Sequence, residues 1–446
     1  MKSLTEGRPL RVILQFAVPL YIGQLFSLCY SLIDTRIIGG TIGQTSLAAV
    51  GSTASLSDLL TEFLSGIVCG FGIVIAKYFG AKEETNLRKA IGGTVCMGVG
   101  ITVFISAVCL LFLPQILGVL NVSEELLPQA SSYIRIIIMG LSASTLYHIC
   151  AAVLRAIGDS FTPLIFLVIS NVLNVFLDYF CVLGLGMGVA GAAAATVVSQ
   201  MISAVLCFLY MRKKYPEIVV CKEERKPEKR MYFELLPTGL SMGFMLSFVL
   251  LGSLALQIGI NSLGSEIIVA HTGARKVTMI FLIPFFVLGT ALATYCSQNL
   301  GAKKQDRLKN GIRDAVLVSL VWCAIVLLIV YTLSPALIRL VTASRQPEVL
   351  ENAVRYLKVN AVFYFLPALI CILRNSMQGL GDTKTPLISS LIELVGKMLI
   401  AWLLVPSLKY VGVIVAEPVV WGIMVIPLLV QMSRSPVMRD RQEREE

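Results

Sequence analysis

The sequence has few charged residues and almost no histidine. Only 14% of its 446 residues are charged, whereas 56% are hydrophobic, so the chain has too little polar surface for a soluble globule of this size. The two histidines, His148 and His271, stand alone, and no His, Cys and carboxylate cluster has metal-ligand spacing. A Walker-type nucleotide loop is also missing. We therefore expect neither an enzyme nor a cofactor or metal centre.

Paired cysteine spacing is absent as well. Ten of the eleven cysteines lie within apolar segments, and Cys221 lies in a charged loop. We interpret them as small apolar packing residues rather than a disulfide framework.

Long apolar runs, by contrast, are abundant. Each of twelve runs could cross a hydrocarbon layer of about 30 Å, which predicts an all-α integral membrane protein with twelve transmembrane helices. The first run is longer than the apolar core of a signal peptide, so we expect it to stay in the membrane. The predicted spans are 11–36, 47–76, 90–113, 128–155, 161–184, 189–212, 234–260, 268–298, 310–332, 350–376, 384–407 and 411–432.

The net charge of +10 is distributed unevenly between alternate loops. Most of the 37 Lys and Arg residues fall in the segments that are cytoplasmic if the N-terminus is inside, among them the 374–384 turn. One external stretch, 333–358, is an exception. The positive-inside rule thus predicts a multi-pass protein of the plasma membrane with both termini in the cytoplasm. The basic surplus then serves topology and contact with anionic membrane lipids, and no nucleic-acid partner is expected.

Two pairs of segments repeat along the chain. "GAKEETNLRKAIGG" from Gly80 resembles "GAKKQDRLKNGIRD" from Gly301, and "RAIGDSFTPLI" from Arg155 resembles "QGLGDTKTPLI" from Gln378. The offsets, 221 and 223, are nearly the same. They predict an N-terminal lobe (1–210, spans one to six), a charged cytoplasmic linker (211–233) and a C-terminal lobe (234–446, spans seven to twelve). An even number of spans per lobe makes the lobes parallel repeats, as in many secondary transporters.

The second repeated segment contains a glycine turn. Gly158 suits the C-terminal cap of one helix, and Thr162 with the proline after it suits the N-cap and first turn of the next. The same reasoning applies to Gly381 and Thr385. A moving hinge is the alternative function for this turn.

Polar side chains follow helical spacing inside three spans of the first lobe. A charge at mid-membrane costs roughly 2.5–3.5 kcal/mol on insertion scales, so each ionisable residue needs a reason. The three stripes predict a polar chamber within the lobe that binds a proton or Na⁺, while a structural polar cluster is the alternative. The stripe residues are Gln24, Ser27, Tyr30, Ser31 and Asp34; Asn171, Asn174 and Asp178; and Thr196, Ser199, Gln200 and Ser203.

The repeat offset gives a test of this chamber. With an offset of 223, Lys397 is the repeat equivalent of Asn174, and Ala401 is the repeat equivalent of Asp178. The second lobe therefore lacks the acidic site. Acidic residues with a general structural role would be expected to remain in both lobes more often than residues of a specialised ion site. Their loss from the second lobe therefore favours the ion site.

Other intramembrane charges have less certain roles. Asp58 and Glu62 are four residues apart in span two and could face a cavity or an unrecognised helix partner. Glu393 and Lys397 have the same spacing in span eleven, which favours an intrahelical ion pair, with a place in the cavity as the alternative. Glu417, which precedes a proline, is interpreted as part of a kink or cap.

These residues resemble a known family. "ILQFAVPLYIGQLFSLCYSLIDTRIIGG" in span one, "AKYFGAK", "QNLGAK" and "LRAIGDSFTPL" look like a multidrug and toxic compound extrusion (MATE) transporter. Within that family the chain is similar to DinF-type members, whose pattern places a bend at Pro19 and a cation site at Tyr30, Asp34, Asn174, Asp178 and Thr196. The NorM branch instead uses acidic residues in the second lobe, and span seven here has no internal carboxylate. Asp58 and Glu62 depart from the pattern.

The resemblance implies a secondary active antiporter. It would export drug-like, often cationic amphipathic compounds in exchange for H⁺ or Na⁺, with cation binding bending span one at Pro19. A lipid-linked oligosaccharide or lipid flippase of the same superfamily is the alternative, and a channel or receptor is less favoured because no loop is long enough for a ligand domain. A monomer is expected.

Overall fold

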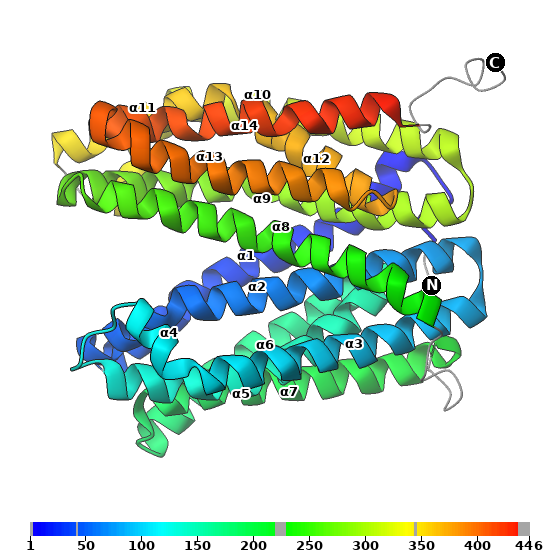
Figure 1. Ribbon diagram of the computed structural model, residues 1–446, viewed down its shortest axis with the longest axis horizontal. Coiled ribbons are helices and arrows are strands. Elements are labelled where there is room, and N and C mark those ends of the chain that lie inside the picture. Colours follow the sequence, from blue (N-terminus) through cyan, green and yellow to red (C-terminus); the bar gives the residue numbers. More distant parts are fainter. Residues whose placement is uncertain (1–2, 42, 219–228, 343–345, 436–446) are drawn as a thin grey trace. The chain divides into compact units, whose positions relative to one another are not determined.

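The computed structural model describes residues 3–41, 43–218, 229–342 and 346–435, without the side chains of 32 and 34–41. Every regular element in these ranges is helical (Figure 1). The elements are α1 (Pro9–Thr41), α2 (Gln44–Ala81), α3 (Glu84–Leu111), α4 (Leu113–Val119), α5 (Leu127–Ala156), α6 (Phe161–Tyr179), the π-helical η1 (Phe180–Gly184), α7 (Gly188–Lys214), the 3₁₀-helical η2 (Pro216–Ile218), α8 (Lys229–Asn261), α9 (Ser265–Gly301), α10 (Gln305–Thr342), α11 (Pro347–Val362), α12 (Phe365–Gly379), α13 (Lys384–Leu408) and α14 (Tyr410–Arg434).

The helices confirm the twelve predicted spans. Within the described ranges, eleven helices are long and apolar enough to cross a membrane, and α11 with α12 forms a twelfth span that bends by 54°. The bend was not predicted. Pro367 has no N–H group to donate to the carbonyl of Phe363. The missing hydrogen bond interrupts the helix just before this proline. The short α4 was also not expected.

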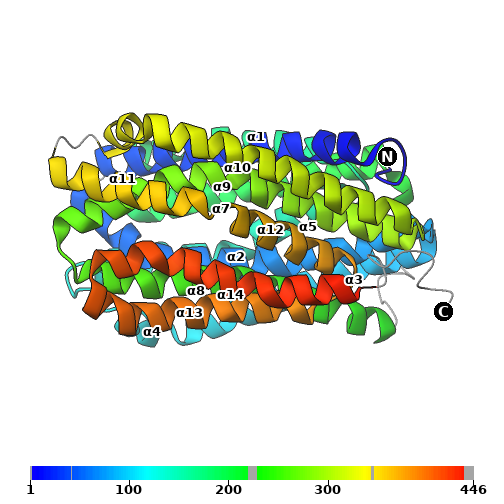
Figure 2. The same ribbon diagram turned by 90° about the horizontal axis from the view of Figure 1, so that it is seen from above.

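The chain divides into two compact units. Unit 1 comprises 1–3 and 18–243, and unit 2 comprises 4–17 and 244–446. In unit 1, α5 packs against α2 and α7, and α6 packs against α7; in unit 2, α12 packs against α9 and α14, and α13 packs against α14 (Figures 1 and 2). The helix pairs that pack together in unit 2 are the repeat equivalents of those in unit 1. The two repeats therefore fold alike.

The unit boundary lies inside α8 rather than in the charged linker. The sequence reasoning placed all of 234–446 in the second lobe, yet α8 up to Gly243 belongs to unit 1. The reason is close backbone packing on α2: a Cβ atom added to Gly66 would lie 2.8 Å from Gly243 Cα, and one on Gly70 would lie 2.7 Å from Gly239 Cα. Most of the linker, 219–228, lies outside the described residues.

The repeated turns end and start helices as expected, with one correction. Gly158 (φ 87°) has the left-handed conformation of a C-terminal cap, as does its counterpart in the second repeat. The capping side chain of the next helix, however, is Asp159 rather than Thr162. Its carboxylate accepts hydrogen bonds from the Thr162 N–H (3.0 Å) and hydroxyl (2.7 Å). The first N–H groups of a helix have no acceptor within the helix, and a side-chain oxygen satisfies one of them. Asp382 binds Thr385 in the same way.

The Asp159 carboxyl is also held by the end of α7. Its Oδ2 accepts a hydrogen bond from the Tyr215 hydroxyl (2.9 Å) and lies 3.6 Å from Lys214 Nζ. Burial raises the pKa of Asp159, but the bonds from Thr162 and Tyr215 and the Lys214 charge outweigh it, and the net pKa is lowered. The turn is therefore a fixed, ionised cap that ties α6 to α7.

Candidate functional site

Three helices of unit 1 bring four of the predicted site residues together. Tyr30 of α1, Asn174 and Asp178 of α6 and Thr196 of α7 meet around the Asn174 amide. The Tyr30 hydroxyl bonds to this amide, whose nitrogen donates to Asp178 Oδ2 (2.9 Å) and whose oxygen accepts from the Thr196 backbone N–H (3.0 Å). A hydroxyl, an amide and a carboxylate thus meet in one place, with the amide nitrogen facing the carboxylate.

The cluster is buried at the end of α6. Asn174 and Asp178 are 2% and 0% exposed, and their four-residue spacing puts both on one helical face. The helix continues after Tyr179 as the π-helical turn η1, a local widening that is frequent at functional sites. A carboxyl group this deeply buried inside a span costs several kcal/mol unless it is paired or hydrogen-bonded. Such residues within spans are rare and usually functional, which makes Asp178 a functional candidate.

Four other first-lobe candidates lie on α1 and α6. Gln24 is exposed and Asn171 half-buried, so neither is enclosed as Asn174 is. Pro19 lies inside α1, directly after the residue at which α1 passes from unit 2 to unit 1. Asp34 belongs to α1, but its side chain lies outside the described residues.

A polar cavity of about 100 Å³ adjoins the cluster within unit 1. At about 30 Å³ per molecule, it has room for roughly three waters. Thr196 lines the cavity and contacts the Asn174 amide, which in turn bonds to the Asp178 carboxyl. The polar residues lining it are Ser57, Thr61, Tyr133, Ser144, Thr196 and Gln200.

Asp58 and Glu62 are not part of this cluster. Both are on α2, next to Ser57 and Thr61, and both side chains are exposed on unit 1. Carboxylates at membrane depth normally face protein or a water-filled space rather than lipid. Their role stays a prediction.

Unit 2 confirms the predicted ion pair of Glu393 and Lys397 and adds a third charge. Glu393 Oε1 lies 2.9 Å from Lys397 Nζ, and Oε2 lies 3.6 Å from Arg374 Nη1 of α12. Lys397 also donates to Ser253 of α8 (3.3 Å). The sequence reasoning placed Arg374 in a cytoplasmic turn, but it is 7% exposed within α12, because that helix runs on to Gly379. The Glu393 and Lys397 side chains are thus buried in a three-charge cluster.

Glu417 is likewise an ion-pair residue rather than a kink or cap. Its carboxylate pairs with Arg275 of α9 and accepts a hydrogen bond from the Tyr356 hydroxyl of α11 (2.5 Å). The His271 ring packs edge-on against Tyr356, with centroids 5.1 Å apart. Helix α14 passes through Pro418 without ending. These partners lie on two other helices, far from Glu417 in the sequence. Helical spacing within one span could therefore not reveal this network.

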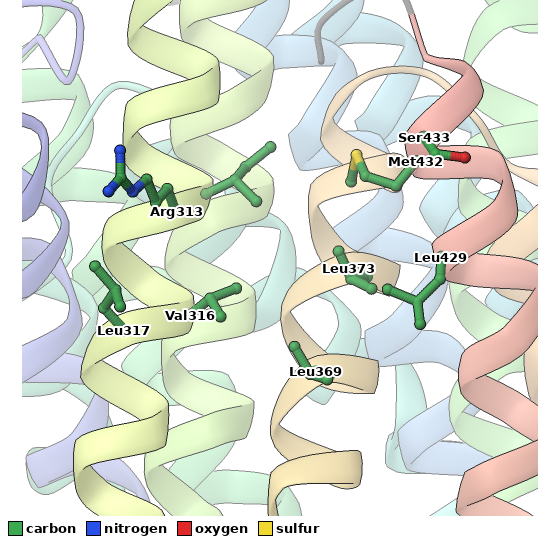
Figure 3. A pocket seen from close by; sticks show the side chains of 9 residues that line it. Arg313, Val316, Leu317, Leu369, Leu373, Leu429, Met432 and Ser433 are labelled. Atoms are coloured by element: carbon green, nitrogen blue, oxygen red, sulfur yellow. The ribbon is translucent and has the colours of Figure 1, made fainter. Parts of the chain in front are cut away.

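A second, larger cavity has none of these charged residues in its lining. It is a groove of about 390 Å³ in unit 2, between α10, α12 and α14 (Figure 3). Its lining is aliphatic except for Arg313 and Ser433, and it lacks the convergent polar groups expected of an ion site. The buried polar cluster of unit 1 is therefore the better candidate site. Lining residues are Ile312, Arg313, Val316, Leu317, Leu369, Leu373, Leu429, Met432 and Ser433.

Two repeated six-span units, one with a buried polar cluster beside a π-helical segment and the other with a broken span, are an arrangement found among membrane transporters. The sequence model of the MatE family matches residues 19–180 and 242–403, two segments offset by 223 as in the repeat. The chain belongs to the MatE family, and the resemblance is confirmed. The DinF-like branch stays a prediction.

Several known proteins are similar over nearly the whole chain. The probable multidrug resistance protein YoeA of Bacillus subtilis is 27% identical and covers 92% of this chain and 90% of its own length. A multidrug resistance MATE family transporter solved in an outward-facing conformation has a TM-score of 0.88 at 21% identity, covering 98% of both chains. A MOP superfamily transporter from Pyrococcus furiosus Vc1, described as having a binding pocket of reversed polarity, has a TM-score of 0.87 at 20% identity and covers 98% of both chains. At these identities the structures establish the fold.

Proposed function

We propose that the protein is a secondary active multidrug exporter that exchanges cationic or amphipathic organic compounds for H⁺ or Na⁺. The observation that carries this proposal is the buried Asp178, bonded through Asn174 to groups from two other helices. Carboxylate and hydroxyl oxygens suit a proton or a hard monovalent cation. The name of the B. subtilis relative supports drug-like compounds as the substrate class.

Coupling would act through α1. A cation bound at Asp178 and Asp34 would draw on groups of α1 and α6, and Tyr30 already links the two helices. Pro19 weakens α1 where it passes from one unit to the other, so a change of contacts near Tyr30 would bend the helix there. Each charge moving through 100 mV releases about 2.3 kcal/mol, enough for one ion to drive a substantial substrate gradient.

The test uses inverted membrane vesicles and a fluorescent organic cation. Asp34→Asn and Asp178→Asn should each abolish uptake driven by an imposed pH or Na⁺ gradient while the protein stays folded and inserted. The comparison of the two gradients identifies the coupling ion. Glu124→Gln, in an exposed loop, is the matched control and should transport normally. Normal uptake by both aspartate variants would reject the proposal.

A lipid-linked oligosaccharide or lipid flippase is the second candidate, and one observation favours it. Unit 2 holds the buried Arg374 and Lys397 and the partly buried Arg275 beside two buried glutamates, a surplus of positive charge that would suit an anionic headgroup. Each of these basic groups is already bonded to a carboxylate, which favours the exporter. Movement of a fluorescent phospholipid across proteoliposomes, unaffected by Asp178→Asn, would favour the flippase instead.

We further expect a monomer in the plasma membrane with both termini in the cytoplasm. Membrane lipids would contact the many exposed aliphatic side chains of α10, α13 and α14. Accessibility of single introduced cysteines to impermeant reagents would test the topology.

A further inference from the structure

The two copies of the Gly-Ala-Lys motif end α2 and α9 in the same way. Lys82 (φ 60°) and Lys303 (φ 57°) both have the left-handed conformation, and each N–H bonds to a carbonyl three residues earlier, at 3.1 and 3.0 Å. This helix cap accounts for the Gly-Ala-Lys part of the motif. It does not account for the two polar residues before it, Lys77-Tyr78 in one copy and Gln298-Asn299 in the other.

In unit 2 those two residues bind the chain just before α1. Gln298 and Asn299 are both 0% exposed. Gln298 Oε1 accepts the Leu4 N–H (2.9 Å), and Asn299 Nδ2 donates to the Leu4 carbonyl (3.3 Å). Leu4 itself is 3% exposed, so this residue is buried and both its backbone N–H and its carbonyl are bonded.

Arg307 of α10 holds the rest of the same segment. Its guanidinium donates to three backbone carbonyls, those of Leu4 (3.2 Å), Glu6 (3.3 Å) and Gly7 (2.5 Å). Its Nε donates to Asn299 Oδ1 (3.0 Å), which fixes the direction of the side chain. Lys304 adds a bond to a fourth carbonyl of the segment (2.9 Å). We call Leu4–Gly7 together with Gln298, Asn299, Lys304 and Arg307 the N-terminal latch.

In unit 1 the equivalent residues bind the start of α8. Lys77 Nζ lies 2.6 Å from Glu234 Oε1, and the Tyr78 hydroxyl donates to Glu234 Oε2 (2.6 Å). The 221 offset relates Lys77 to Gln298 and Tyr78 to Asn299. We call Lys77, Tyr78 and Glu234 the α8 latch. In each repeat, therefore, the end of the second helix holds the beginning of the other repeat's first helix.

We propose that the two latches open and close in each transport cycle, with Arg307 as the positioning residue of the N-terminal latch. This inference rests on the proposed exporter function. Helix α1 leaves unit 2 after Ala17, and α8 leaves unit 1 after Gly243, so each latch anchors the end of a helix that two units share. A closed latch fixes the predicted cytoplasmic end of that helix. An open latch would free it while substrate loads from the cytoplasm.

The first experiment measures amide hydrogen exchange in the N-terminal peptide of the whole protein in lipid nanodiscs. Arg307→Ala should raise exchange at Leu4–Gly7 about tenfold or more, because it removes several charged hydrogen bonds. A transported fluorescent cation should also raise this exchange in the unmodified protein, a response that a merely structural contact would not show. Asn310→Ala, exposed on the same helix, is the matched control and should behave as the unmodified protein.

The second experiment locks the latch. Thr5→Cys with Lys304→Cys, joined by a reducible bifunctional reagent, should arrest vesicle uptake, and a reductant should return uptake to its level before joining; the same reagent should not change the uptake of either single cysteine variant. Unchanged uptake by the joined protein, or exchange at Leu4–Gly7 that does not rise with the transported cation, would overturn the latch proposal. Absence of cation-driven uptake by the unmodified protein would instead count against the exporter function, and the effect of Arg307→Ala on exchange would still test the latch contact.

Discussion

Replacing Glu393 with glutamine should destabilise the protein more than replacing Lys397 with methionine, although the two residues form one ion pair. The asymmetry comes from Arg374, which lies 3.6 Å from the second oxygen of Glu393. Glu393→Gln leaves two buried cations without their shared counter-charge. Lys397→Met leaves Glu393 still paired with Arg374.

The magnitudes follow from the cost of unpaired buried charges. Removing one partner of a buried pair costs about 3–5 kcal/mol, and Glu393→Gln should reach the upper end because two partners are stranded. Lys397→Met, which loses one charged hydrogen bond and keeps a pair, should cost about 1.5–3 kcal/mol. A difference of about 2 kcal/mol corresponds to roughly 4–8 °C in Tm for a unit of this size.

The assay is thermal unfolding of purified protein in one detergent at one heating rate. Glu351→Gln, an exposed acidic residue of α11, is the control and should leave Tm within about 1 °C, as surface changes usually do. Equal losses for the two cluster variants, or a larger loss for Lys397→Met, would show that Arg374 does not share the Glu393 charge and would refute the reasoning.

Two further predictions concern packing and pH. Gly140→Ala should cost about 1–3 kcal/mol, because its Cβ would lie 2.1 Å from Val197 Cγ2, whereas Gly100→Ala, with nothing within 4 Å, should be neutral or stabilising in the same melting assay. The lowered pKa of Asp159 means that this carboxylate contributes stability above its ordinary pKa of about 3.9, which is lost as the pH falls through the folded pKa. Asp159→Asn should therefore lower Tm at pH 7 and make the fall in Tm below pH 4 shallower; an unchanged profile would contradict this assignment.

The sequence predicted the parts of the fold that depend on periodicity and repetition. Apolar runs of membrane length identified the spans, and the recurring motifs identified the repeat, because both features are written in consecutive residues. Asn174 and Asp178 could be grouped since helical spacing puts them on one face. Their meeting with Tyr30 was expected from the polar stripes and the family resemblance together.

Features that depend on contacts between distant helices could not be predicted in this way. Arg374 looked like a loop charge because it is close to a turn in sequence, and only the length of α12 shows that it is buried. Glu417 had no basic residue at helical spacing, since its partner Arg275 lies in α9. The break between α11 and α12 depends on how one proline is accommodated, which apolar composition does not reveal.

Because α1 and α8 each belong to both units, the boundary between the two sequence repeats differs from the boundary between the two compact units. A fragment that ends in the charged linker would lack the α8 residues that pack on Gly66 and Gly70, and the other fragment would lack Leu4–Gly7. The halves should therefore be stable when expressed together but not singly. In an unfused ancestor with one repeat per chain, the same packing would be a domain-swapped dimer, in which each copy lends its first helix to the other. Fusion would then have made a reciprocal exchange permanent.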